Sequence, residues 1–271
     1  MVGVCLLSAG CQPGAARGGR AICPGKGSIT KAAAVLSLQR QNVQPLQGGA
    51  DCVFHYTDDK GKEQSKEVKA VAVRFVPPDR VLFRGNVFGD VVGFGANENE
   101  FWLRVKPDMD SYWWGTRAQA ALCSDTLLIN PYNVIEALGV VDVDTDWQFS
   151  YKDGSDILTL SDEEGTLVKR VFVNACDYLV ERIEYFDAEG LLKAAATLSD
   201  YTTGEQGLVV PSSIEVTQYQ YGIPEGSVEI ELKHVRPFVP QEKHRALFVR
   251  PEREGFEHLY RLSEHCEFIE Q

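Results

Sequence analysis

The sequence feature that most constrains the fold is a succession of strand-like segments joined by connections of only a few residues. The first three run over 52–57, 68–76 and 80–87. Parallel strands need long helical crossovers, so such short connections predict an antiparallel meander. The later strand-like segments run over 146–151, 157–160, 167–174, 178–186, 191–201, 208–221 and 227–236. A sheet of this size must curl, so we predict a mainly β (α+β) fold with one large curled antiparallel sheet.

The clearest strand pair is a predicted hairpin over 99–117, which holds three of the four tryptophans. The cluster Pro107-Asp108-Met109-Asp110 suits a loop that reverses the chain. Side chains alternate along a strand, so Trp102 points away from its neighbours Phe101 and Leu103. We assign to the concave face the side chains of Phe101, Leu103, Tyr112 and Trp114. This assignment leaves Trp102 and Trp113 on the outer face, as candidates for an exposed patch that binds a partner protein.

Two or three helices are expected to accompany the sheet. Ser28 or Thr30 caps a helix over 31–44, and Asn130-Pro131 begins a short helix that ends at Gly139. The first helix carries a predicted apolar stripe of Ala34, Val35 and Leu38. Near the C-terminus the pattern indicates a short strand over 246–250 and a last helix over 253–263. We interpret Gly85, Gly89, Gly93 and Gly95 as strand turns.

The N-terminal residues are typical of a lipoprotein signal. Residues 1–10 are uncharged and end in small residues before Cys11, which indicates the remnant of a signal peptide and a lipidated cysteine. The Gly-rich residues 11–27 are expected to form a flexible tether, followed by a single domain over 28–271. The alternative is a frayed N-terminus with an incidental cysteine.

Charge and cysteine count restrict the partners. A formal net charge of -12 argues against nucleic acid, which needs clustered Lys and Arg. If Cys5 leaves with the signal and Cys11 carries lipid, five cysteines remain, namely Cys23, Cys52, Cys123, Cys176 and Cys266. One or two disulfides are expected in an oxidising compartment, with at least one thiol unpaired within the chain and the pairing left open.

The sequence lacks the motifs of common enzymes. It contains no GxSxG, HExxH or GxGxxG motif, and no CxxC or other metal-ligand spacing. His258 and His265 are interpreted as exposed residues of the tail. We therefore expect a binding protein without catalytic residues, metal or cofactor.

Several short segments resemble one family. The segments 76–83, 97–105, 173–190 and 248–255, together with the order of helices and meanders, are similar to the periplasmic lipoprotein carriers and outer-membrane lipoprotein receptors of the Lol system (LolA/LolB-like). The resemblance implies an incomplete β-barrel closed by helices, with an apolar cavity for acyl chains. The carriers have a basic residue where this chain has Pro77, which argues against a carrier-type latch, and the cysteine at position 11 favours an anchored, receptor-like member.

The resemblance implies a lipid-anchored protein that binds acyl chains or lipoproteins, in lipoprotein localisation at the periplasmic face of the outer membrane. The predicted cavity is lined by Phe83, Phe101, Leu103, Tyr112, Trp114, Ile183, Tyr185 and Leu232. The predicted helical cover consists of Val35, Leu36, Ile135 and Leu138. Ordinary core packing is the alternative for each of these residues. The alternative function is an envelope sensor or scaffold that binds a partner protein through the same fold.

Overall fold

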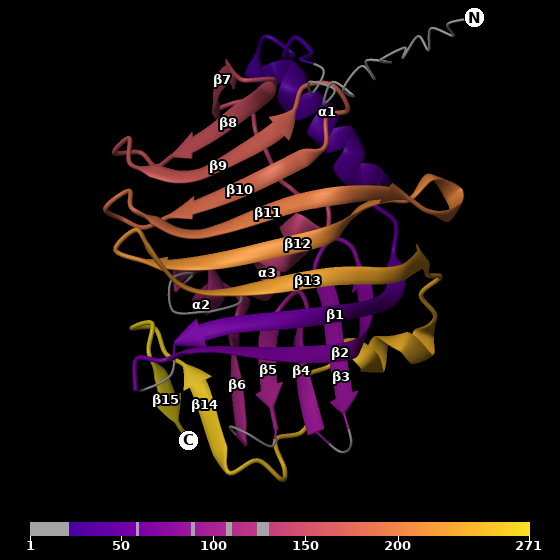
Figure 1. Cartoon of the computed structure of the whole chain (residues 1–271), viewed down its shortest axis with the longest axis vertical. Coiled ribbons are helices and arrows are strands. Elements are labelled where there is room, and N and C mark those ends of the chain that lie inside the picture. The colour runs from indigo at the N-terminus through magenta and orange to yellow at the C-terminus, as the bar shows by residue number, and fades with distance from the viewer. Residues whose placement is uncertain (1–21, 58–59, 88–89, 107–109, 124–129) are drawn as a thin grey trace, which may run out of the picture.

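The structure is a computed structural model that describes the chain except residues 1–21, 58–59, 88–89, 107–109 and 124–129 (Figure 1). The described residues form one unclosed sheet of 15 strands in the order β15-β14-β6-β5-β4-β3-β2-β1-β13-β12-β11-β10-β9-β8-β7. Neighbouring strands are antiparallel except β14, which pairs with β6 in parallel. The predicted single curled antiparallel sheet with helices is confirmed.

The strands of the first half are β1 (Leu46–Thr57), β2 (Glu63–Val76), β3 (Arg80–Val87), β4 (Asp90–Ala96), β5 (Glu100–Val105) and β6 (Ser111–Thr116). Those of the second half are β7 (Gln148–Lys152), β8 (Ser155–Ser161), β9 (Leu167–Asn174), β10 (Val180–Phe186), β11 (Leu192–Thr203), β12 (Val209–Gln220), β13 (Ile223–Pro237), β14 (His258–Leu262) and β15 (Phe268–Glu270). The helices are α1 (Ile29–Asn42), α2 (Arg117–Leu122) and α3 (Pro131–Ala137), with short 3-10 turns η1 (Glu205–Gly207) and η2 (Glu242–Phe248).

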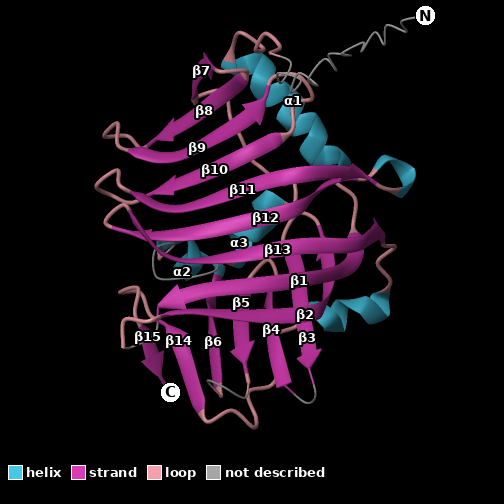
Figure 2. Cartoon of the chain, viewed as in Figure 1, coloured by secondary structure: helices cyan, strands magenta, loops and turns pink. Residues whose placement is uncertain are grey.

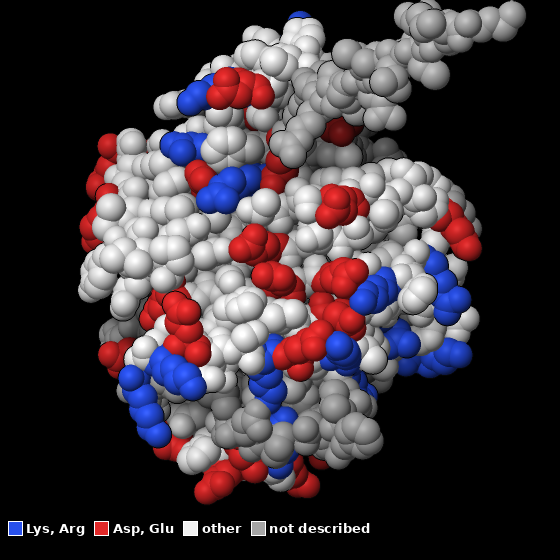
Figure 3. Space-filling model, viewed as in Figure 1, with Lys and Arg blue, Asp and Glu red and all other residues white. Residues whose placement is uncertain are grey.

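The sheet bends between β2 and β3. Strands β7–β13, β1 and β2 run across the view, while β3–β6 are nearly vertical, and α3 lies behind β12 and β13 (Figures 1 and 2). The larger apolar cluster joins the inner face of both halves to α1 and α3. A smaller cluster lies on the other face of β3–β6, under the C-terminal segment 238–262. On the face drawn in Figure 3, Lys and Arg gather in the lower half of the molecule.

Several predicted elements are confirmed because local signals decide them. Strands β3 and β9 have the predicted bounds. Ser28 caps α1, since its side chain accepts a hydrogen bond from the backbone N–H of Lys31. Asn130 caps α3 in the same way, and Pro131 occupies its first turn, where a backbone N–H has no helical partner. None of the described helices is long and apolar enough to cross a membrane.

Four predictions about elements are wrong. The predicted helix over 253–263 contains strand β14 instead, because pairing with β6 determines its conformation. The predicted strand over 246–250 is largely the 3-10 turn η2. Of the glycines predicted at turns, Gly85 lies inside strand β3 and Gly93 and Gly95 lie inside strand β4, while Gly89 is outside the described residues. The buried face of α1 consists of Ala32, Ala33 and Leu36, while Ala34 and Leu38 are exposed.

Two disulfides join distant parts of the chain. Cys23 pairs with Cys176 and Cys123 pairs with Cys266, while the buried Cys52 is free. Residues 22–27, which the sequence assigned to a flexible tether, are held against the end of the sheet. The Lys26 backbone N–H donates to the buried Asp156 carboxylate at 2.9 Å, and the Tyr151 hydroxyl donates to the Cys23 carbonyl at 2.8 Å.

Candidate functional site

The candidate site is the interior of the curled sheet, where helix α3 fills the curve. This helix contacts β3 and β4 of one half and β11 of the other. Ile135 of this helix and Leu138 directly after it are buried in the larger apolar cluster. Leu36 of α1 belongs to the same cluster and Val35 packs against it. The two helices therefore cover one continuous apolar surface contributed by both halves of the sheet.

A polar network fastens α3 to this surface. Glu136 of α3 accepts a hydrogen bond from the Lys169 ammonium of β9 at 2.6 Å and another from the Tyr185 hydroxyl of β10 at 2.5 Å. Lys169 and Tyr185 are directly opposite across the two strands. The pKa of Tyr185 is raised well above its ordinary value. Burial is the main cause, and the negative charge of Glu136 is the second. The neutral phenol is thus kept as a donor to the carboxylate.

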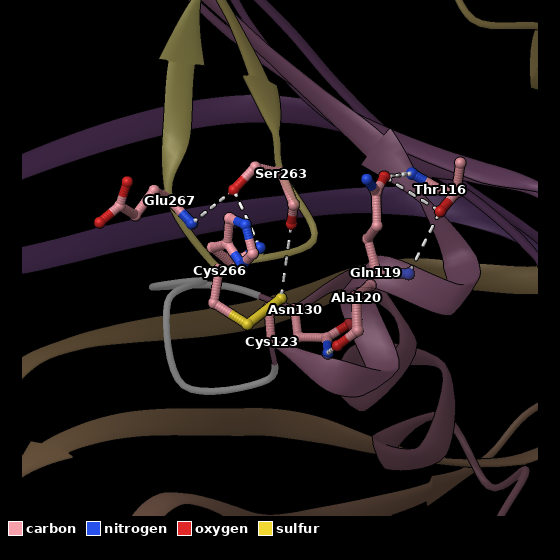
Figure 4. The surroundings of a disulfide bond; sticks show 9 residues. Thr116, Gln119, Ala120, Cys123, Asn130, Ser263, Cys266 and Glu267 are labelled. Carbon is pink, nitrogen blue, oxygen red and sulfur yellow. Dashed lines mark hydrogen bonds between the residues drawn. A yellow bond between two sulfur atoms is a disulfide. The ribbon is translucent and has the colours of Figure 1, made fainter.

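Further contacts fix the N-terminal end of α3. The Tyr132 hydroxyl donates to the Asn97 carbonyl at 3.0 Å, and the Asn130 amide donates to the Ala120 carbonyl of α2 at 3.2 Å. Figure 4 shows α2 beside the disulfide between Cys123 and Cys266, which ties the end of α2 to the turn between β14 and β15. Helix α3 is therefore attached to the rest of the fold by polar contacts of Asn130, Tyr132 and Glu136, and by apolar contacts with the larger cluster.

Six of the eight predicted lining residues lie together on the inner face. The residues buried in the larger cluster or packed against it are Phe83, Phe101, Leu103, Ile183, Tyr185 and Leu232. They belong to the same apolar cluster as the covering helices, so in this arrangement they form part of a packed core. Of the surface hollows in the described structure, one of about 230 Å³ and one of about 820 Å³ are lined by other residues, mostly of the C-terminal segment.

The assignment of Tyr112 and Trp114 to the concave face is wrong. In the hairpin Trp102 lies directly opposite Trp114, so the two share a face, and Tyr112 lies opposite Arg104 on that same face. Tyr112 and Trp114 belong to the smaller cluster, beneath the C-terminal segment. Trp102 is 1% exposed in the same cluster, which removes it as a candidate partner surface. Trp113 is half-buried and stacks on Tyr260, with ring centroids 5.7 Å apart.

Glu136 and Lys169 were missed by the sequence reasoning, although a signal for Lys169 exists. Along β9 the residues at 169, 171 and 173 share a face, and the other two are Val171 and Val173. A lysine on an otherwise apolar strand face predicts a buried cation that needs a carboxylate partner. For Glu136 the sequence shows only a charged residue between Ile135 and Ala137, which is equally typical of an exposed helix position.

Comparisons with known proteins identify the fold. No family model matches the sequence, and no curated protein matches it. Among solved structures, a LolA superfamily protein from Nitrosomonas europaea is similar with a TM-score of 0.50 and 9% identity, over 82% of this chain and 98% of that chain. A DUF1329 family protein from Desulfovibrio piger is similar with a TM-score of 0.51 and 13% identity, over the same shares. The chain therefore has the LolA-like fold.

Proposed function

We propose that this protein binds acyl chains, either free or attached to lipoproteins, between the curled sheet and helices α1 and α3, and that it acts in lipoprotein localisation in the cell envelope. The observation that carries the proposal is the attachment of α3. A helix of only seven residues covers apolar side chains from both halves of the sheet and is held to β9 and β10 through one carboxylate, that of Glu136.

Displacement of α3 would uncover the apolar surface that the ligand needs. Ile183, Leu232 and Phe83 are each buried in the cluster that α3 covers. Burial of one methylene contributes about 0.8 kcal/mol, so an acyl chain of about a dozen methylenes gains on the order of 10 kcal/mol before ordering costs. That gain is of the same order as the burial that displaced α3 would lose, since Val134, Ile135 and Leu138 each contribute about 1.5–3 kcal/mol.

The proposal includes a lipid anchor on Cys11 at the periplasmic face of the outer membrane. The small residues before Cys11 support lipidation. Cys23, only a dozen positions after Cys11, forms a disulfide with Cys176. Cys176 lies just after the C-terminal end of β9, at the end of the sheet. An anchor on Cys11 would thus hold that end of the sheet near the membrane surface.

Mass spectrometry of the full chain, extracted from bacterial membranes in detergent, tests both parts. The expected result is a lipid-modified Cys11, absent in the Cys11→Ser variant, together with acyl-containing molecules that dissociate from the native protein. An unmodified Cys11 would refute the anchor. A native protein that carries no acyl ligand and takes up none from added palmitate or lipoprotein would refute the binding function.

A further inference from the structure

A cluster of arginines lies on the face of β2–β5 opposite the acyl-binding interior. Strands β2, β3 and β5 each place one arginine on this outer face, namely Arg74, Arg84 and Arg104. The neighbours of each in its own strand, namely Phe75, Phe83 and Leu103, point inward to the larger core. Leu82 and Trp102, which lie two residues before Arg84 and Arg104, belong to the smaller cluster on the outer face. The three arginines therefore share a face because side chains alternate along each strand.

The register brings these arginines to neighbouring positions. Arg84 lies directly opposite Gly93 of β4, and Gly93 lies directly opposite Arg104. Because the intervening residue is a glycine, no side chain separates the two arginines, whose backbones are two strand spacings or roughly 10 Å apart. Arg74 lies opposite Leu82 and is thus the diagonal neighbour of Arg84, roughly 7–8 Å away. These separations suit three long side chains that converge on one small ligand.

The cluster has no internal counter-charge. Other arginines nearby are paired, for example Arg80 with Glu98 and Arg250 with Glu100. Arg74, Arg84 and Arg104 form no ion pair with any side chain that the structure describes, in a chain with 39 Asp and Glu against 27 Lys and Arg. The chain is therefore rich in acidic residues, but among the residues that the structure describes none pairs with these three arginines.

Two of the three guanidinium groups carry a buried donor without an acceptor. The Nε atoms of Arg74 and Arg104 are buried and have no hydrogen-bond partner among the described residues. A buried donor left without an acceptor destabilises the fold, so neither guanidinium group has its hydrogen-bonding capacity met by the described residues. Burial is the main cause that lowers the pKa of Arg104; Tyr112, directly opposite, acts the other way, and the positive charge of Arg84 lowers the pKa further.

From this geometry we infer that Arg74, Arg84 and Arg104 form a binding site for a phosphate-type oxyanion, either free or in the head group of an anionic lipid. Guanidinium groups bind such oxyanions through paired, charge-assisted hydrogen bonds, and their planar fork matches the oxygens of a phosphate. The site lies on the opposite side of β3–β5 from the proposed acyl-binding interior. It can therefore be occupied whether or not the interior binds acyl chains.

Calorimetric titration with inorganic phosphate and co-sedimentation with vesicles test the site on the full chain. The variants are Arg84→Gln and Arg104→Gln, and the matched control is Arg236→Gln, which removes an exposed arginine of β13. Each site variant is expected to weaken binding about tenfold or more, since one charge-assisted hydrogen bond contributes at least that much. The control is expected to bind like the wild type.

The two probes distinguish the sources of the anion. If inorganic phosphate binds, and if Arg84→Gln and Arg104→Gln weaken this binding while Arg236→Gln does not, the site binds a free anion. Binding only to vesicles of phosphatidylcholine with phosphatidylglycerol, and not to phosphatidylcholine alone, assigns a lipid head group. No binding in either assay overturns the inference, as does an equal effect of Arg84→Gln and Arg236→Gln.

Because Arg84 is exposed, Arg84→Gln should keep the wild-type melting temperature without ligand. Its acyl binding, measured separately, should also be unchanged.

Discussion

The Lys169 ammonium lies 2.6 Å from Glu136 Oε1, and this ion pair joins a strand of the sheet to the helix that fills its curve. Lys169 is only 8% exposed, so the pair is formed away from bulk water. A buried charge that loses its partner is strongly destabilising. The pair therefore favours the closed arrangement, in which α3 covers the apolar interior.

Replacement of Lys169 tests this role of the pair. Lys169→Gln should lower the free energy of unfolding by about 1–3 kcal/mol, because it leaves the Glu136 carboxylate without its cation. It should also speed the uptake of an acyl ligand, since α3 is held less tightly. Urea unfolding and stopped-flow binding of a fluorescent fatty acid measure the two effects.

The matched control for Lys169→Gln is Lys152→Gln, at an exposed position of β7. Its unfolding free energy should stay within about 0.5 kcal/mol of the wild type. If Lys169→Gln behaved like this control in both assays, the ion pair would have no part in holding α3.

Stability should fall at alkaline pH because of buried tyrosines. Burial raises the pKa values of Tyr132, Tyr178, Tyr185 and Tyr201 above the ordinary 10.0. Above that value the unfolded chain loses phenolic protons that the folded chain retains. The contribution of these tyrosines to the free energy of unfolding should therefore be constant below the ordinary pKa and decrease as the pH rises from it toward the pKa values of the folded protein.

Tyrosine variants check the origin of this alkaline decrease. Tyr201→Phe removes one buried phenol and should reduce the slope of unfolding free energy against pH, measured by urea titration above about pH 10. Tyr221→Phe removes an exposed phenol and should leave the slope unchanged. Equal slopes for the wild type and Tyr201→Phe would contradict the explanation.

The thiol of Cys52 should be unreactive in the folded protein. Burial raises its pKa to about 12, so almost none of the nucleophilic thiolate is present at neutral pH. Iodoacetamide labelling followed by peptide mass spectrometry should show Cys52 unmodified in buffer and modified in urea. Rapid labelling without denaturant would show that β1 opens readily.

The pairing of β14 with β15 should depend on pH through His258. The hydrogen bond with Glu270 is the main cause that raises the pKa of His258 above 6.5. The stabilisation that protonated His258 contributes is fully present below pH 6.5. It is lost as the pH rises through the pKa that His258 has in the folded protein. Glu270→Gln should move the His258 pKa, measured by proton NMR, back toward 6.5. An unchanged pKa would show that the contact is absent in solution.

The hairpin shows how far sequence reasoning reached. Its two arms were predicted, but the face of the second arm depends on the number of loop residues. A loop of the four residues 107–110 would pair Leu103 with Trp114, whereas the observed register pairs Leu103 with Trp113. A shift of one residue moves every side chain of the strand to the other face. Both candidate faces were aromatic, so the sequence did not decide between them.

Strand β4 was missed because its glycines are typical of turns. A side chain at Gly95 would come within 2.4 Å of the Trp102 ring, which packs over this position. The glycine is thus explained by a neighbour on the next strand, and single-sequence patterns do not show such a contact. Single-sequence patterns likewise do not show the pairing of β14, because its partner strand β6 is more than a hundred residues away in the sequence.

A local signal for α2 was present but unused. Thr116 and Gln119 form a capping box, in which each side chain bonds the backbone of the other. This spacing of Thr and Gln marks a helix start directly after the hairpin. Helix starts and the longer strands could thus be read from neighbouring residues, whereas faces and distant pairings depended on the complete fold.

The most direct test of acyl binding in the interior is photocrosslinking with a palmitate that carries a diazirine at mid-chain, followed by peptide mass spectrometry. Acyl binding in the interior should give crosslinks to the inner face of the sheet and to α3, at Phe83, Ile135, Ile183 and Leu232. Unlabelled palmitate should compete for them, and Lys169→Gln should accelerate their formation. Crosslinks confined to exposed apolar residues such as Leu122 and Ile223, or no competable crosslink at all, would contradict it.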